Sequence, residues 1–404
     1  MRFLHLPQFL PLVRSFRPFT QAVLTLCALC VLCGEITAQD FKTLKPGVEY
    51  AEVTKEISGL KVNMNLLRLD LKKVRIDVHH AMDAAIGTEK TSSIATRHGA
   101  FAAINAGFFR LDTSIWAGDS AGILKIDGKV LSEGANNRVG LMIKNSELST
   151  EVAIANLSTM VALIRNVVPV RLKSRDKVSW MVSGVNRERK SDELLIYTPE
   201  FGRTTLTNPD GLEIVVSNGK VTGVFLKQGS SPIPNDGFVI SASGKYVLDL
   251  SNVLIADRFV FGIPGANVRS SIYTGSDNRM VSLFEDITNG VPQLIKNSKI
   301  DITWQEEKSS KSFVETRHPR TAVAKLKDGK FLMITVDGRT ESSGGIGLQD
   351  LAEYLLSLGA TDAMNLDGGG STTMFVDGKV VNHPSDKEGE RKVSDALLVT
   401  LRRK

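Results

Sequence analysis

Toward its C-terminus the chain alternates apolar runs and polar turns in an order that predicts strand, helix and strand. Residues 330–336 are rich in β-branched and large apolar side chains, which is typical of a buried strand. Apolar residues then recur at helical spacing, at Leu348, Leu351, Ala352, Leu355 and Leu358. Gly359 ends this helix, and residues 360–366 form the second strand. If the two strands are parallel, the residues that follow them lie at the same edge of a sheet.

The N-terminal half has a weaker pattern that also favours strands. Residues 48–53 and 62–71 alternate between apolar and polar, with Gly59 as a break between them. Residues 88–98 predict a short helix that ends at Gly99.

Turn signals decide the fold class. Asp-Gly-Lys or Asn-Gly-Lys triplets, each flanked by apolar residues, predict β-hairpins at 127–129, 218–220, 328–330 and 377–379. Their irregular spacing argues against a repeat. We therefore predict an α+β fold: a sheet-dominated mixed domain with several hairpins and few helices. It includes the C-terminal strand-helix-strand unit, which we expect to carry the functional site. The stretch from Pro264 to Asn289 has the least pattern and is expected to be a surface loop.

The first forty residues differ from the rest. Arg2, Arg14 and Arg17 precede an apolar run over residues 19–34, and Ala38 offers a small residue for cleavage. This pattern predicts a secretory signal peptide over residues 1–38, and hence an exported, periplasmic or extracellular protein. An uncleaved membrane anchor and lipidation near Cys33 remain open alternatives.

Composition narrows the chemistry. The chain of 404 residues is 42% hydrophobic and 23% charged, which is typical of a soluble globular protein. Its cysteines are Cys27, Cys30 and Cys33, so cleavage of the signal would leave no thiol for disulfides, nucleophilic catalysis or zinc binding. The net charge is +6, but basic residues are scattered and aromatic residues are 6%, so no nucleic-acid surface is predicted. No membrane contact is predicted beyond the signal segment.

The stretch at residues 365–373, Asn-Leu-Asp-Gly-Gly-Gly-Ser-Thr-Thr, is poor material for a core, because it buries little apolar surface and costs backbone entropy to order. Glycines allow a close approach to a ligand, and successive amides can bind an anion. Comparable polar residues follow two other predicted strands, as Asp337-Gly338-Arg339 after 330–336 and as Asn105 and Gly107 after 101–104.

A further basic turn precedes a predicted strand. It reads Arg317-His318-Pro319-Arg320-Thr321, and Pro319 restricts its backbone. Arg320 could present its planar guanidinium to a phosphate or carboxylate. Alternatively, Arg320 forms a salt bridge with Glu315 or Asp337 in a purely structural turn.

Several other constellations are missing from the sequence. It has no P-loop, no His-Glu-x-x-His, no EF-hand pattern and no Gly-x-Ser-x-Gly elbow. His79 and His80 lie in a strand-like stretch and are expected to be structural or exposed, whereas His318 neighbours other candidate residues. No cofactor is predicted, although the aspartate pair could hold a divalent cation.

Together these motifs resemble the phosphodiester glycosidase family. The resemblance covers about residues 97–401. Its motifs are Asn105 to Phe109, Asn186 to Gly202, Arg317 to Ala322, Val336 to Arg339, Asn365 to Thr373 and Glu390 to Ser394. It implies a catalytic domain at 97–404 and a hydrolase whose partner is a phosphorylated glycan or sugar-phosphodiester. The alternating pattern described above separately predicts a β-rich N-terminal region at 40–95.

On this resemblance the catalytic residues are Asp367 and Asp337. The substrate-binding residues are expected to be His318, Arg320, Thr321, Arg339, Asn105, Gly107, Asn365, Gly368, Gly369, Gly370, Ser371 and Thr372. Asp367 would act as nucleophile or base. Arg320 and the backbone amides of the glycine loop, residues 368–370, would stabilise the phosphate leaving group. Two alternatives stay open: a metal-dependent phosphoesterase, or a non-catalytic envelope protein that binds a glycan.

Overall fold

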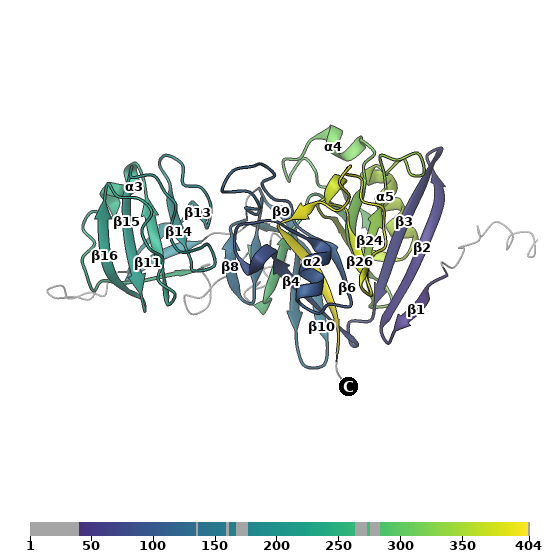
Figure 1. The fold of residues 1–404 in the computed structure, drawn as a ribbon, viewed down its shortest axis with the longest axis horizontal. Helices are drawn as coiled ribbons and strands as arrows, with labels where there is room; N and C mark the ends of the chain where they lie inside the picture. The colour runs from purple at the N-terminus through teal and green to yellow at the C-terminus, as the bar shows by residue number, and fades with distance from the viewer. Residues whose placement is uncertain are drawn as a thin grey trace, which may run out of the picture. The chain divides into compact units, whose positions relative to one another are not determined.

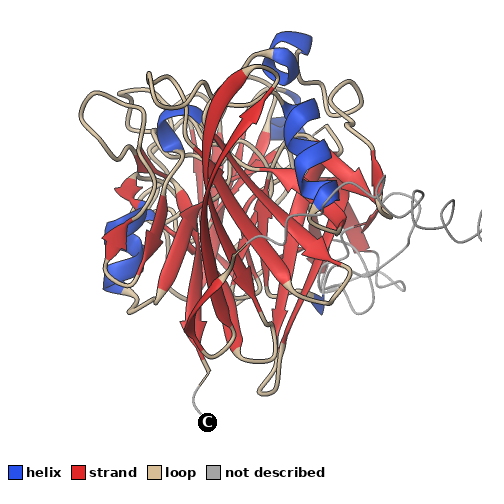
Figure 2. Cartoon of the chain, turned by 90° about the vertical axis from the view of Figure 1, so that its right-hand side faces the viewer, coloured by secondary structure: helices blue, strands red, loops and turns tan. Residues whose placement is uncertain are grey.

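The computed structural model describes residues 40–134, 136–158, 161–166, 177–262, 273–274 and 283–402. The predicted signal peptide, residues 1–38, lies outside them. Strands dominate this part of the chain (Figure 2). Its helical segments are η1 (Ala81–Asp83), α2 (Thr91–Arg97), α3 (Lys245–Asp249), α4 (Lys311–Glu315), α5 (Leu348–Ser357) and η4 (Gly369–Ser371). The predicted sheet-dominated α+β class is confirmed. None of the described helices is long and apolar enough to cross a membrane.

One eight-stranded sheet, called the central sheet below, has the strand order β1-β2-β3-β24-β23-β25-β21-β22. Figure 1 labels its strands β1, β2, β3 and β24. Residues from both ends of the described chain therefore share one sheet. Its strands are β1 (Lys42–Lys45), β2 (Val48–Ile57), β3 (Leu60–Leu69), β21 (Gln293–Lys296), β22 (Lys299–Ile300), β23 (Arg320–Leu326), β24 (Phe331–Val336) and β25 (Ala360–Asn365).

The predicted strand-helix-strand unit is β24, α5 and β25. Each of the two strands pairs antiparallel with β23, which lies between them, so β24 and β25 run parallel. In this register Arg320 faces Val336, and Ala322 faces Asn365. The start of β23 therefore lies at the same edge of the sheet as the ends of β24 and β25.

A five-stranded sheet, in the order β27-β26-β6-β29-β4, brings the Asn105 segment to this edge. Its central strand β6 pairs with β26 and β29, and β29 pairs with β4. The strands are β4 (Val74–His80), β6 (Ala102–Asn105), β26 (Met374–Val376), β27 (Lys379–Val380) and β29 (Asp395–Leu401). A separate pair joins β5 (Glu89–Lys90) to β28 (Lys392–Val393).

Two further sheets complete the described fold. The six-stranded sheet, in the order β19-β10-β9-β20-β7-β8, contains β7 (Leu124–Ile126), β8 (Lys129–Ser132), β9 (Arg138–Asn145), β10 (Thr150–Ser158), β19 (Tyr273–Thr274) and β20 (Asp286–Asn289). The other eight-stranded sheet, in the order β12-β11-β18-β16-β15-β17-β14-β13, contains β11 (Ala162–Asn166), β12 (Lys177–Met181), β13 (Gly184–Val185), β14 (Leu194–Tyr197), β15 (Leu212–Ser217), β16 (Lys220–Leu226), β17 (Gly237–Ala242) and β18 (Arg258–Gly262).

All of the predicted hairpins join antiparallel neighbours: β7 with β8, β15 with β16, β23 with β24, and β26 with β27. In three of them the Asp-Gly or Asn-Gly dipeptide has both φ angles positive, between 48° and 83°. This is the conformation that a tight two-residue turn requires. The turn between β23 and β24 is longer, and there Gly329 has a φ of 81°.

The central sheet is apolar on both faces. One face joins the five-stranded and six-stranded sheets in a core that includes Met333, Met364 and Leu397. The other face is covered by α5, whose Leu351 and Leu355 are fully buried. Burial on both sides fixes the strand ends that carry the candidate residues.

The prediction of a surface loop from Pro264 to Asn289 is wrong for the last residues of that stretch. Residues 286–289 form β20, which is buried in the six-stranded sheet. The Asp286 carboxylate accepts hydrogen bonds from the amides of Val78 and Asp127, at 2.9 and 2.8 Å. These two bonds make burial of a polar strand possible, and hydropathy alone gives no sign of them. Much of the remainder of this stretch lies outside the described residues.

Candidate active site

Sequence-distant acidic and basic residues meet at the edge where β24 and β25 end. Asp337 follows β24, Asp367 follows β25, and Arg320 begins the strand between them. The amide of Leu366 donates to the carbonyl of Thr321 at 2.9 Å, which extends the pairing up to Asp367. The expectation that the two aspartates leave parallel strands on the same side is therefore met.

Asn105 ties three of these segments together. Its side-chain nitrogen donates to the carbonyl of Asp367 at 2.7 Å. Its side-chain oxygen accepts from the Thr321 hydroxyl at 2.7 Å and from the Thr373 amide at 3.1 Å. Asn105 and Thr321 are both fully buried. Their polar atoms are thus used inside the protein, where they fix the position of Asp367.

The Asp367 carboxylate is partly buried and turns back onto its own loop. Its Oδ1 accepts from the Gly368 amide at 2.9 Å. Burial raises the pKa of Asp367 to about 6, although the Ser371 hydroxyl, the Gly368 amide and Arg391 act in the opposite direction. A carboxylic acid with this pKa changes its charge near neutral pH, which is what acid–base catalysis requires.

Asp337 is held more tightly. Its Oδ1 accepts from the His383 amide at 2.9 Å and from the Asn382 side chain at 3.3 Å. Asn382 also donates to the Thr372 carbonyl at 3.0 Å, which links Asp337 to the glycine loop. Burial raises the pKa of Asp337 as well.

The basic turn forms a cationic cluster beside these carboxylates. Nη2 of Arg339 lies 3.3 Å from Nδ1 of His318. The Arg339 guanidinium also lies against Gly369, where an added Cβ would be 3.1 Å from Nη2. Burial lowers the pKa of His318, and Arg320 and Arg339 both act in the same direction. The positive potential here therefore comes from Arg320 and Arg339, which favour the neutral form of His318.

The Arg320 guanidinium is directed at backbone carbonyls. Its Nη2 donates to the carbonyls of Phe313 and Thr316, at 2.6 and 3.0 Å, and its Nε donates to that of Ile346 at 3.4 Å. The salt bridge to Glu315 or Asp337 is not among the ion pairs of the described residues. Burial lowers the pKa of Arg320 to about 10, with Arg339 acting in the same direction. Arg320 is thus a buried cation stabilised by carbonyl dipoles.

The glycine loop uses most of its own amides. The Gly369 amide donates to Pro319, that of Ser371 to Gly368, and that of Thr372 to Gly369. Gly369 has a φ of 62°, which favours glycine. At Gly370 a Cβ would lie 2.1 Å from Asp386 Oδ1 and 2.2 Å from Arg391 Nη2, so the loop packs directly against that ion pair.

The other candidates are buried around the loop. Asn365 donates to the carbonyls of Val291 and Leu366, at 2.7 and 2.8 Å. The Gly107 amide donates to Asp395 at 3.1 Å. Ser371 and Thr372 are almost fully buried. These positions support the loop, whereas Arg339 is exposed and Asp367 is partly exposed at the same edge.

Four further residues hold the site and were not predicted from the sequence: Asn382, His383, Asp386 and Arg391. Asn382 and His383 hold Asp337, as described above. Asp386 and Arg391 pair through two bonds of 2.7 and 2.9 Å beside Gly370. Arg391 belongs to one of the motifs that carry the family resemblance, and that was the available signal. Asn382 and His383 follow a predicted hairpin, and nothing local marks them.

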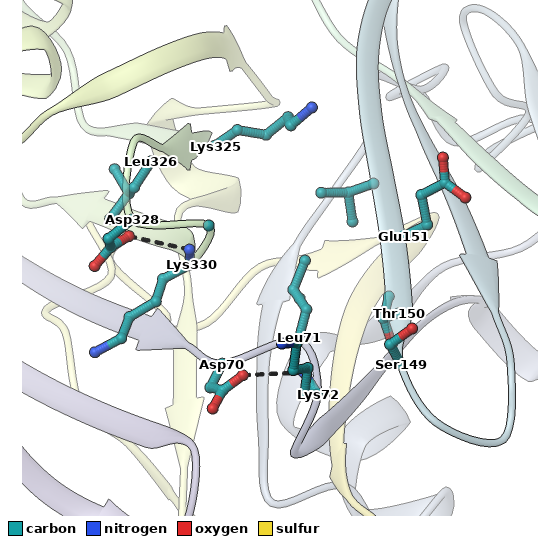
Figure 3. Close-up of a pocket in the computed structure, with 12 residues that line it drawn as sticks. Asp70, Leu71, Lys72, Ser149, Thr150, Glu151, Lys325, Leu326, Asp328 and Lys330 are labelled. Carbon is teal, nitrogen blue, oxygen red and sulfur yellow. Dashed lines mark hydrogen bonds between the residues drawn. The ribbon is translucent and has the colours of Figure 1, made fainter.

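A hollow of about 680 Å³ lies at the opposite ends of the same strands (Figure 3). It is lined by residues around the turn from β23 to β24, including Lys325, Asp328 and Lys330, and by Asp70 to Lys72 and Ser149 to Val152. Because β24 starts at this hollow and ends next to Asp337, the hollow is distinct from the candidate active site.

Comparison with known proteins identifies the family resemblance independently. Residues 210–400 match the family model described as phosphodiester glycosidase, which confirms the resemblance seen in the motifs. The N-acetylglucosamine-1-phosphodiester alpha-N-acetylglucosaminidase of Bos taurus is 38% identical over 112 residues, which cover 26% of this chain and 21% of the bovine protein. The SPbeta prophage-derived uncharacterized protein YomE of Bacillus subtilis is 42% identical over 87 residues, which cover 22% and 13%. The chain thus matches only a small part of the length of each of these two relatives, 21% and 13% respectively.

Among solved structures, the chain is similar to a hypothetical protein from Synechocystis. The TM-score is 0.73 at 21% sequence identity, with 91% of this chain and 64% of that chain covered. At this identity the likeness concerns the fold.

Proposed function

We propose that this chain, whose residues 210–400 match the phosphodiester glycosidase family, hydrolyses the glycosidic bond of a sugar-1-phosphodiester. The products are a free sugar and a phosphomonoester. N-acetylglucosamine is the first sugar to test, because the bovine relative is named for that substrate.

One observation carries the proposal: Asp367, with a pKa of about 6, follows β25 at the edge where the Arg339 cation contacts His318. A sugar-1-phosphodiester presents both chemical features that such a site would recognise. Its anomeric carbon becomes electrophilic as the bond breaks, and its phosphate carries the negative charge. A carboxylate beside cationic groups suits both.

Asp367 is the proposed nucleophile, or the base that activates water. At neutral pH its carboxylate is largely ionised, and the Asn105 bond to its carbonyl holds the backbone in place. Asp337 is the proposed second carboxylate. It also holds Asn382 and His383, so its loss would disturb both the charge and the loop beside the site.

The phosphate is proposed to bind at Arg339 and His318. Arg339 is exposed, and its guanidinium contacts the His318 ring. Arg320 would contribute positive potential from beneath, because its Nη2 and Nε are engaged by carbonyls. Phosphate is a good leaving group, so binding its charge matters more than protonating it.

Hydrolysis of methyl N-acetylglucosamine-1-phosphodiester in ¹⁸O-water tests the proposal. Cleavage of the carbon–oxygen bond gives methyl phosphate without ¹⁸O, which ³¹P NMR detects through the isotope shift. Asp367→Asn should lower kcat by about 10²–10⁴-fold. Asp328→Asn is the matched control, since Asp328 is an exposed turn residue at the opposite end of the strands.

Other outcomes assign other functions. Label in the phosphate product would mean attack at phosphorus, as in a phosphoesterase. Binding of the diester without turnover, unchanged in Asp367→Asn, would indicate a glycan-binding protein. Either result would overturn the glycosidase proposal.

We further propose that the protein is exported, with cleavage after Ala38 or Gln39. The basic and apolar pattern of the first forty residues supports this. N-terminal sequencing of protein from the culture medium or periplasm should begin at Gln39 or Asp40, and an intact Met1 would argue against cleavage.

A further inference from the structure

Two histidines and an aspartate meet outside the candidate active site. His79 is the penultimate residue of β4, Asp83 ends η1, and His98 follows α2. Their potential ligand atoms all lie within 4.8 Å of one another. The two imidazole rings stack with centroids 3.8 Å apart, and Nε2 of His98 lies 3.0 Å from Oδ1 of Asp83.

The fold positions these side chains from three directions. β4 pairs with β29, where His79 faces Ala396. Ala396 belongs to the core on which α2 packs through Ile94 and Ala95, so α2 brings His98 over the same face of the sheet. Asp83 arrives through a tight turn in which its φ is 53°.

Arg97 orients the aspartate. Its Nη1 contacts Oδ2 of Asp83, and its Nη2 binds Glu89 at 2.9 Å. This leaves Oδ1 of Asp83 directed at His98. Metal-binding carboxylates are commonly held in this way by a partner on their second oxygen.

Nε2 of His98 has two neighbours with opposite hydrogen-bonding roles. This atom lies 3.0 Å from Nη1 of Arg97 and 3.0 Å from Oδ1 of Asp83. If Nε2 carries a proton, it opposes the donor Arg97; if it carries a lone pair, it opposes the Asp83 oxygen. A cation between Nε2 and Oδ1 removes the second conflict, since both atoms then act as ligands.

The cluster is open to solvent. It lines a cavity of about 260 Å³ together with Lys129 and Glu200. The Asp83 side chain is 57% exposed and that of His98 is 23% exposed. A metal ion can therefore enter, and water can occupy a further coordination position.

We propose that His79, Asp83 and His98 bind a divalent transition-metal ion of the zinc class. Two imidazole nitrogens and one carboxylate oxygen favour Zn²⁺ over Mg²⁺ or Ca²⁺, which prefer oxygen ligands. Bond lengths near 2.1 Å place tetrahedral ligand atoms about 3.4 Å apart. The ligand atoms, now within 4.8 Å of one another, would therefore move closer on binding, and the stacked imidazole rings would rotate toward the ion. The ion links β4, η1 and α2. The site shares no residue with the proposed active site and does not depend on the proposed function.

Metal titration of the tag-free, chelator-treated chain tests the site. Isothermal titration with Zn²⁺ should show one equivalent bound, and Co²⁺ should give the visible absorption of a low-coordinate complex. His79→Gln, His98→Gln and Asp83→Asn should each weaken Zn²⁺ binding at least about tenfold. Asp112→Asn is the matched control, because Asp112 pairs with Arg110 in a similar exposed setting without a histidine.

Thermal melts without metal establish that each variant is folded. The parent should gain thermal stability on adding Zn²⁺, and the folded variants should gain much less. Failure of the parent to bind one equivalent would overturn the proposal. Parent-like binding in His98→Gln or in Asp83→Asn would do the same, and the exposed Asp83 variant keeps the test decisive if a histidine variant fails to fold.

Discussion

The side-chain amide of Asn105 reaches the backbone carbonyl of Asp367 across 2.7 Å, although 262 positions separate the two residues in the chain. The same side chain accepts from Thr321 and from the Thr373 amide. Asn105 thus fastens the end of β6 to the end of β25 and to the glycine loop. The position of the proposed nucleophile depends on this buried residue.

Asn105→Ala should therefore reduce both stability and activity. It leaves the Asp367 carbonyl, the Thr321 hydroxyl and the Thr373 amide without a partner in a fully buried environment. We expect a loss of about 2–4 kcal/mol in the free energy of unfolding, measured by urea denaturation. A change below about 0.5 kcal/mol would show that water replaces the side chain at little cost.

Asp367→Asn should lower kcat by about 10²–10⁴-fold without unfolding the protein. The amide side chain has nearly the same shape and can still accept the bond from the Gly368 amide. Kinetics on a sugar-1-phosphodiester and a thermal melt give the two readouts. Wild-type turnover in this variant would remove Asp367 from the mechanism.

The same substitution should change how stability depends on pH. The pKa of Asp367 is raised to about 6 in the folded protein, above its ordinary value of 3.8. Its contribution to stability is therefore fully present below pH 3.8 and is lost as pH rises through about 6. Relative to Asp367→Asn, the parent should lose stability between about pH 4 and pH 6, where the folded state holds this proton and the unfolded state does not. Parallel unfolding curves for the two proteins across this range would contradict the raised pKa.

Local sequence signals predicted the elements of the site well. The Asp-Gly and Asn-Gly turns marked all of the expected hairpins, because their backbone conformation is set by the two turn residues themselves. The leucine spacing of α5 and the polar ends of β24 and β25 were also visible, since burial imposes a period on each element.

Long-range pairing could not be read in the same way. Nothing in the residues of β24 and β25 shows that β23 lies between them. The direction of Arg320 toward Phe313 and Thr316 depends on where α4 packs, and Asn382 reaches Asp337 only through the folded hairpin. His79 was expected to be structural or exposed. The sequence does not show that it lies near Asp83 and His98, because the packing of α2 on the sheet brings them together.

The two arginines at the site should respond differently to substitution. Arg339 is exposed beside His318, so Arg339→Ala should leave the unfolding free energy nearly unchanged. If Arg339 binds the substrate phosphate, its loss removes a charge-assisted contact, and KM should rise about 10- to 100-fold. Saturation kinetics on a sugar-1-phosphodiester measure this, and an unchanged KM would assign the phosphate to other groups.

Arg320→Lys should act mainly on stability. The guanidinium bonds Phe313 and Thr316 through Nη2 and Ile346 through Nε, and one ammonium group cannot reproduce this spread. We expect a loss of about 1–3 kcal/mol in the free energy of unfolding, because buried carbonyls lose a charged donor. Urea denaturation and KM measured on the same preparation separate the two arginines. A variant with parent stability and a strongly raised KM would instead place Arg320 in direct contact with the phosphate, as the sequence first suggested.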